Sequence, residues 1–147
     1  MAAYRLKQQL VNNMSEQTSQ SERDEFREYC QRWLEENRPP PTKIPLPQNA
    51  YEVTFHDHRT YLCDWQAKCY EAQLIGTDVP QDYGGHGHTE FQAIASAEVR
   101  KANVPYFINW IGLGMTAPTL LIHGTEEQKK RFLPPIFSAE EIWCQGF

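Results

Sequence analysis

The stretch HGTEEQKKRFLPPIFSAEEIWCQGF, residues 123–147, carries the clearest structural signals in this 147-residue chain. Thr125 is a good helix N-cap, and Gln128 three residues later completes a capping box. Two glutamates then precede the basic run KKR, so charges of favourable sign lie at both ends of the helix dipole. We therefore predict a helix over residues 126–133, which the proline pair at 134–135 ends.

Apolar residues at helical spacing predict four further helices upstream of this one. Their expected ranges are residues 21–37, about 54–74, about 90–102 and about 117–122. We expect Ser21 to cap the first of them. Thr54 with Asp57 is expected to cap the second, and Thr89 with Gln92 the third, each as a capping box.

Short connectors between these helices predict an all-α fold, an antiparallel helical bundle. The expected core consists of large side chains on the apolar helix faces: Phe26, Trp33, Leu62, Trp65, Phe91, Ile94, Leu120, Leu121 and Phe132. Cys30 and Cys69 fall on the same faces, where a free thiol behaves as a small hydrophobe. Residues 1–20 are polar or weakly patterned, and we expect a flexible leader there.

The composition argues against several classes of function. The net charge is −5, and basic residues are interspersed with acidic ones, so we expect no nucleic-acid surface. No apolar run approaches the roughly 20 residues of a membrane helix. His86 and His88 lack an evident third metal ligand, so no metal site is expected. We expect a cytoplasmic location, with mitochondrial as the alternative because residues 1–15 contain two basic residues and no acid.

Two features between residues 98 and 115 leave alternatives open. Glu98 falls near an apolar helix face, and a paired acid is favoured there over a buried general base, because an unpaired buried carboxylate is costly. The run VPYFINWIGLGM, residues 104–115, is apolar on every side and is either a central core helix or a cavity wall. Gly112 and Gly114 within it favour a close backbone approach or a helix break.

Three blocks together resemble the N-terminal domain of the acyl-CoA dehydrogenases. They are VPQDYGG (79–85), the helix carrying Ala97-Glu98 with the apolar run after it, and residues 123–147. The blocks occur in the family's order, whereas residues 21–75 match only in helical character. The resemblance implies a helical domain over residues 21–141. It also implies that residues 142–147 are the first strand of a β-domain, with that domain and a second helical domain lying beyond Phe147.

The resemblance further implies oxidation of an acyl-CoA thioester to the 2-enoyl-CoA with FAD as cofactor. The family's catalytic Glu lies in its last domain, so we assign no catalytic residue here. Electron-transfer flavoprotein would be the electron acceptor, and the complete enzyme would be a homo-oligomer. Gln145, Gly146 and Phe147 would neighbour the flavin. The simpler interpretation is that they only open the first strand of the β-domain, and the two roles are compatible.

By register with Pro118, the family's acyl-binding wall would here comprise Tyr106, Phe107, Trp110 and Gly114. Ordinary core packing is the competing interpretation of these four residues. Two other functions stay open. The chain resembles oxidases and flavin monooxygenases of the same superfamily, and a free-standing helical module would bind a partner through exposed Trp143 and Phe147.

Overall fold

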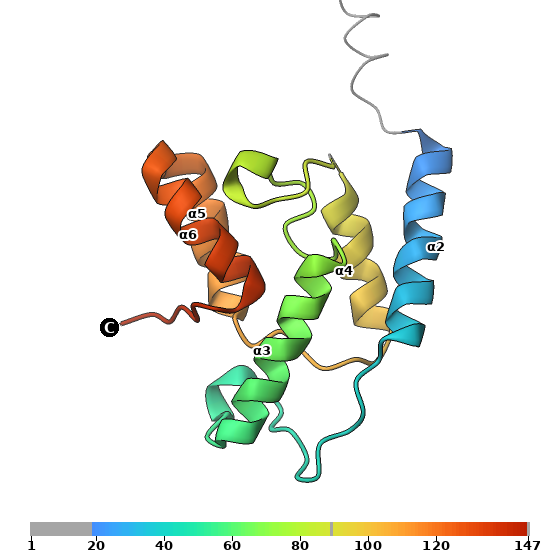
Figure 1. Cartoon of the computed structure of the whole chain (residues 1–147), viewed down its shortest axis with the longest axis vertical. Helices are drawn as coiled ribbons and strands as arrows, with labels where there is room; N and C mark the ends of the chain where they lie inside the picture. The colour runs from blue at the N-terminus through green and yellow to red at the C-terminus, as the bar shows by residue number, and fades with distance from the viewer. Residues whose placement is uncertain (1–18, 89, 147) are drawn as a thin grey trace, which may run out of the picture.

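The computed structural model describes residues 19–88 and 90–146, and this part of the chain is helical (Figure 1). No strand occurs within it, so the all-α prediction is confirmed. The elements in order are α2 (Gln20–Glu36), η1 (Ala50–Glu52), α3 (His56–Glu71), η2 (Gln81–Tyr83), α4 (Phe91–Lys101), η3 (Gly112–Thr116), α5 (Ala117–His123) and α6 (Glu126–Ser138). The predicted leader, residues 1–20, lies outside the described residues except for its last two.

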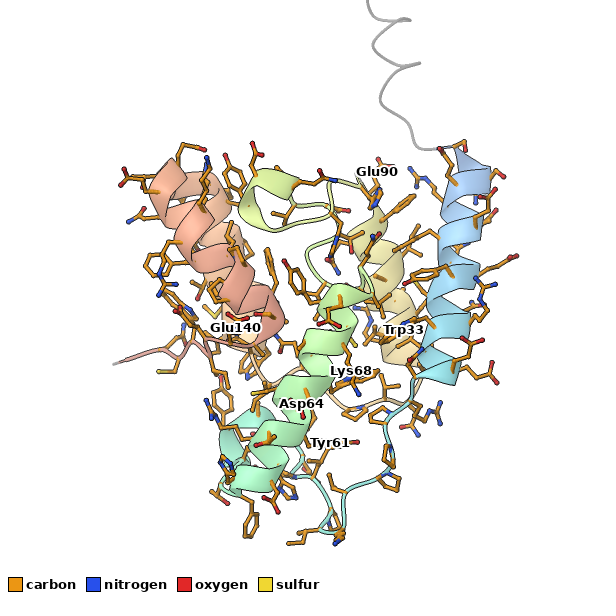
Figure 2. All side chains as sticks on the ribbon, in the orientation of Figure 1. Trp33, Tyr61, Asp64, Lys68, Glu90 and Glu140 are labelled. Atoms are coloured by element: carbon orange, nitrogen blue, oxygen red, sulfur yellow. The ribbon has the colours of Figure 1, made fainter. Side chains whose placement is uncertain are left out.

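Helix α3 occupies the middle of the bundle (Figure 1). It packs against α6 on one side, α2 packs against α4 on the other, and α5 lies against α6. Trp33 of α2 lies between that helix and the centre, where its ring stacks on Trp65 at a centroid distance of 5.9 Å (Figure 2). Asp64 and Lys68 are on the exposed face of α3. One apolar stripe per helix therefore faces a shared core.

Two of the predicted helix starts are wrong. Ser19, not Ser21, caps α2, because Glu22 three residues after Ser19 closes a capping box. At the start of α3 the N-cap is Phe55, and no side chain caps it, so the predicted box of Thr54 and Asp57 does not form.

The predicted capping box of α6 is confirmed. Thr125 accepts a hydrogen bond from the backbone of Gln128, whose side chain in turn accepts one from Thr125. Thr89, expected to cap α4, lies outside the described residues. The position before α4 is occupied by Glu90, in the left-handed region at φ 70°.

The predicted end of α6 at the proline pair is also wrong, because the helix continues through 134–135 to Ser138. Each proline in a helix interior costs about 3 kcal/mol, about 6 for the pair. The continuation buries Ile136 and Phe137. Burial of two such side chains contributes roughly 3–6 kcal/mol, which is comparable with the local penalty.

The predicted core is largely confirmed. Phe26, Leu62 and Trp65 are buried, and the other six predicted side chains are half-buried against the main cluster. Leu62 belongs to a smaller second cluster with Ile108. Cys30 is fully buried as expected, and this burial raises the pKa of its thiol to about 12. Cys69 is fully buried as well, so these two thiols are packing groups rather than nucleophiles.

Glu98 is a paired acid, as favoured from the sequence. It is 4% exposed, and its carboxylate accepts hydrogen bonds from Lys101 Nζ at 2.8 Å and Gln31 Nε2 at 3.0 Å. The Lys101 hydrogen bond is the main reason that the pKa of Glu98 is lowered, and Arg27 adds an attraction at 3.9 Å. The group therefore joins α2 to α4 instead of acting as a base.

This lowered pKa predicts a pH-dependent contribution to stability. A carboxyl whose folded pKa is depressed stabilises the fold above its unfolded pKa of about 4.3, and this contribution is lost as pH falls through the folded value. We expect Lys101→Ala to destabilise the protein at pH 7 but hardly at pH 2. The measurement is urea unfolding at both pH values. Lys43→Ala, an exposed lysine in the connector, is the control, and equal pH profiles for the two variants would contradict the pairing.

Residues 76–88 form a tight loop between α3 and α4. Gly84 has φ 78°, and the backbone N–H of Gly85 donates to Pro80 O at 3.1 Å. A Cβ at Gly85 would lie 2.0 Å from Val79 O. We therefore expect Gly85→Ala to destabilise the fold by about 1–3 kcal/mol. The check is thermal unfolding beside Gly146→Ala, whose Cβ would meet nothing within 4 Å, and matching melting temperatures would exclude a tight loop.

Candidate functional site

An apolar cavity of about 510 Å³ lies among the loop after α3, α4, the segment before η3, α5 and α6. All four residues predicted to form an acyl-binding wall line it: Tyr106, Phe107, Trp110 and Gly114. The structure thus brings these residues together at one concave surface. Pockets of several hundred Å³ with mostly apolar walls are typical ligand sites.

The cavity wall explains the unusual apolar run over residues 104–115. Residues 104–107 have no regular structure, and a π-helical turn, η3, follows at Gly112–Thr116. The run is therefore not a central core helix, and the cavity-wall alternative is the correct one. A Cβ on Gly114 would meet nothing within 4 Å, whereas one on Gly112 would lie 2.4 Å from Asn109 Oδ1. Gly114 thus leaves open space at the wall, whereas Gly112 allows the side chain of Asn109 to lie close to the backbone.

The four predicted residues occupy different parts of this wall. Trp110 is 44% exposed and meets Tyr51 edge-on at 5.0 Å between ring centroids, so it forms part of the rim. Tyr106 and Phe107 are half-buried. Burial raises the pKa of the Tyr106 phenol, so that group is neutral at physiological pH.

Several lining residues were not predicted from the sequence. The buried ones are Ile75, Val79, Ala117 and Phe137. They come from the loop after α3, from α5 and from α6, and only the fold brings them together. Ala117 is next to Pro118, the residue that set the register of the prediction, so proximity in sequence was the one available signal.

The polar side chain of Gln92 also lines the cavity, but the protein satisfies it. Its Oε1 accepts from Thr77 N at 3.0 Å, and its Nε2 donates to Leu74 O at 3.1 Å. Gln92 therefore fixes the loop after α3 rather than capping α4, which corrects its predicted role. Because its amide is used internally, the cavity presents a surface suited to hydrocarbon.

The tail after α6 passes close to the cavity wall. Trp143 is half-buried and packs edge-on against Phe132 at 5.4 Å between ring centroids. Gln145 Nε2 lies 3.5 Å from Met115 Sδ, and Met115 belongs to η3. Gln145 and Gly146 are exposed, and Phe147 lies outside the described residues. Trp143 is thus not the exposed anchor that an interaction module would use.

Other candidate sites have structural explanations. His86 Nε2 lies 3.0 Å from Tyr70 O, and burial lowers the pKa of this imidazole. Within residues 19–88 and 90–146, no group of three or more His, Cys, Asp or Glu side chains is placed to hold a metal ion. No helix in the same ranges is long and apolar enough to cross a membrane.

Comparison with known families agrees with this geometry. The family model for the acyl-CoA dehydrogenase N-terminal domain matches residues 20–140. This chain belongs to the acyl-CoA dehydrogenase family. The membership predicted from the sequence motifs is therefore confirmed, and the match extends to the N-terminal helices that resembled the family only in helical character.

Three relatives illustrate the similarity. Acyl-CoA dehydrogenase IpdE1 of Mycobacterium tuberculosis is 30% identical over 129 residues, 84% of this chain and 32% of the relative. Acyl-CoA dehydrogenase IpdE1 of Mycolicibacterium smegmatis is 38% identical over 84 residues, which are 56% of this chain and 21% of the relative. FadE34 of M. tuberculosis is 41% identical over 85 residues, 56% of this chain and 11% of the relative. The chain thus spans a third or less of each, and no solved structure matches it significantly.

Proposed function

We propose that this chain is the acyl-binding, N-terminal part of a flavin-dependent acyl-CoA dehydrogenase that forms a 2-enoyl-CoA. The observation that carries the proposal is the apolar cavity, which contains all four of the residues expected to contact the acyl group. In this role, Tyr106, Phe107 and Trp110 exclude water from the acyl chain and orient it. Gly114 leaves the space that the chain fills.

The chemistry of such an enzyme needs a group that this chain does not supply. FAD, when bound, accepts the β-hydrogen of the acyl group as hydride. In this proposal Gln145, Gly146 and Phe147 neighbour the flavin. The described tail residues fit that role, because Gln145 and Gly146 are exposed and the space around Gly146 is open to an approaching ring.

The general base is assigned to a part of the enzyme outside this chain. The one buried carboxylate among the described core residues, Glu98, is paired with Lys101 and does not line the cavity. Residues 142–147 would begin the β-domain that contacts the flavin. Electron-transfer flavoprotein would be the acceptor, the complete enzyme a homo-oligomer, and its location cytoplasmic or mitochondrial.

The proposal predicts that the 147-residue chain alone does not dehydrogenate acyl-CoA. General-base chemistry needs a carboxylate within hydrogen-bond reach of the α-proton, and none lines the described cavity. The assay is dye reduction by the purified chain with added FAD and acyl-CoA thioesters of several lengths. Turnover by the chain alone would contradict the assignment of the base to another domain. The in-frame coding sequence after Phe147 gives a second test, since the family would continue with S-E-P-x-x-G-S-D.

A further inference from the structure

A buried asparagine links the cavity wall to the tail. Asn109 is fully buried, in the segment between Phe107 and η3. Its side-chain Nδ2 donates to Ile136 O at 3.0 Å and Glu141 O at 2.9 Å, and its Oδ1 accepts from Trp143 N at 2.9 Å. One amide thus contacts the end of α6 and two backbone groups of the tail.

A second buried amide fixes the position of the first. Gln66 of α3 is fully buried, and its Oε1 accepts from Asn109 N at 3.1 Å. Its Nε2 donates to Ile136 O and to Phe137 O, both at 3.1 Å. Gly112 completes the arrangement, since a Cβ there would lie 2.4 Å from Asn109 Oδ1. Every polar atom of both side chains is therefore satisfied, as a rigid buried network requires.

The chemistry of this position needs an amide in particular. Asn supplies two donors for the carbonyls and one acceptor for the Trp143 N–H, whereas Asp supplies no donor when ionised. The tail has other contacts, including Glu141 N to Pro135 O at 3.1 Å and an ion pair of Glu141 with Arg131. These hold the tail to α6. Two of the bonds from Asn109, to Glu141 O and from Trp143 N, join the tail to the segment that forms the cavity wall, and both are shorter than the 3.5 Å contact of Gln145 with Met115.

We infer that Asn109 is a positioning residue, which holds residues 141–146 in a fixed register with the cavity wall at 106–110. The inference rests on the proposed function, in which that wall holds the acyl group and that tail neighbours the flavin. Asn109 thereby sets the place of the flavin-side tail relative to the acyl chain. Gln66 and Gly112 support it, and none of the three touches a reacting atom.

The first measurement is amide hydrogen exchange in the 147-residue chain. Asn109→Ala removes all three side-chain bonds, and Gly112→Ala displaces the amide while keeping Asn109. The control is Leu34→Ala, which removes a buried side chain from α2. At urea concentrations that equalise global stability, we expect the Trp143 amide to exchange at least about tenfold faster in the two test variants than in the control, because an N–H that loses its partner exchanges through smaller openings. Equal exchange rates of the Trp143 amide in the test variants and in Leu34→Ala would overturn the inference.

The second measurement uses the complete flavin-loaded enzyme. Asn109→Ala should lower the rate of FAD reduction by acyl-CoA and shift the FAD absorption band, with the dissociation constant of acyl-CoA changed less than twofold. Leu34→Ala should leave all three unchanged. Faster Trp143 exchange with an unaltered flavin band and reduction rate would overturn the positioning role. A wild-type enzyme whose FAD no acyl-CoA reduces would instead overturn the proposed function and the flavin role of the tail, while the exchange data still decide whether Asn109 holds that tail.

Discussion

Replacing Trp65 with alanine is expected to lower the free energy of unfolding by about 3–5 kcal/mol. Trp65 is 1% exposed and lies at the centre of the bundle, where its ring stacks on Trp33. Its indole Nε1 also donates a hydrogen bond to Pro105 O at 2.9 Å, and Pro105 immediately precedes the cavity-wall residue Tyr106. The variant therefore loses packing and leaves a half-buried carbonyl without its partner.

Urea unfolding monitored by circular dichroism measures this loss. Trp110→Ala is the matched control, because the same side chain is removed from a site that is 44% exposed. We expect the control to lose much less stability than Trp65→Ala. A Trp65→Ala value within about half a kcal/mol of neutral, the usual range for surface substitutions, would mean that this face of α3 is not the core.

Replacing Gly114 with leucine is expected to produce the largest effect on ligand binding. Gly114 is exposed and lines the cavity, and a Cβ there meets no atom within 4 Å, so we expect the leucine side chain to occupy the cavity mouth without displacing the walls. The four carbon atoms that leucine adds displace a similar number of acyl-chain methylenes. At about 0.8 kcal/mol per buried methylene, the loss is about 3 kcal/mol, or roughly a hundredfold in Kd.

The measurement is calorimetric titration of the complete enzyme with long-chain acyl-CoA and with a short-chain thioester. We expect the long chain to lose most of its affinity and the short chain to lose little. Thr119→Leu adds apolar surface to an exposed position of α5 and is the control. An equal loss for both thioesters, or for both variants, would show that the cavity does not hold the acyl chain.

Local signals predicted well where one residue pair decided the outcome. The box of Thr125 and Gln128 forms as expected, because both partners lie within one helical turn. The start of α2 was misplaced because Ser19 and Ser21 are both suitable N-cap residues followed by acidic ones. Only Ser19 has a glutamate three residues later, and Ser21 instead donates to Glu25 within the helix. Such choices depend on fractions of a kcal/mol, which sequence patterns do not resolve.

Long-range packing explains what the sequence did not show. The proline pair predicted a helix end, yet α6 continues past it and buries Ile136 and Phe137. Asn109 is the only amide in the run at 104–115, and this isolation was a usable signal. Its partners, however, come from α3, α6 and the tail, and no local rule connects them. The apolar pattern left a cavity wall as one of two alternatives for residues 104–115, and only the family resemblance selected four residues of it. The other lining residues required the fold.

The most direct test of the account is photo-crosslinking with a long-chain acyl-CoA that carries a diazirine at the end of its acyl chain. After irradiation of the complete enzyme, digestion and mass spectrometry locate the labelled residues. We expect labels on cavity-lining residues such as Phe107, Leu113 and Leu121. Excess unlabelled acyl-CoA should suppress these labels, and free CoA should not. Suppressible labels confined to residues outside this cavity would contradict the claim that it binds the acyl group.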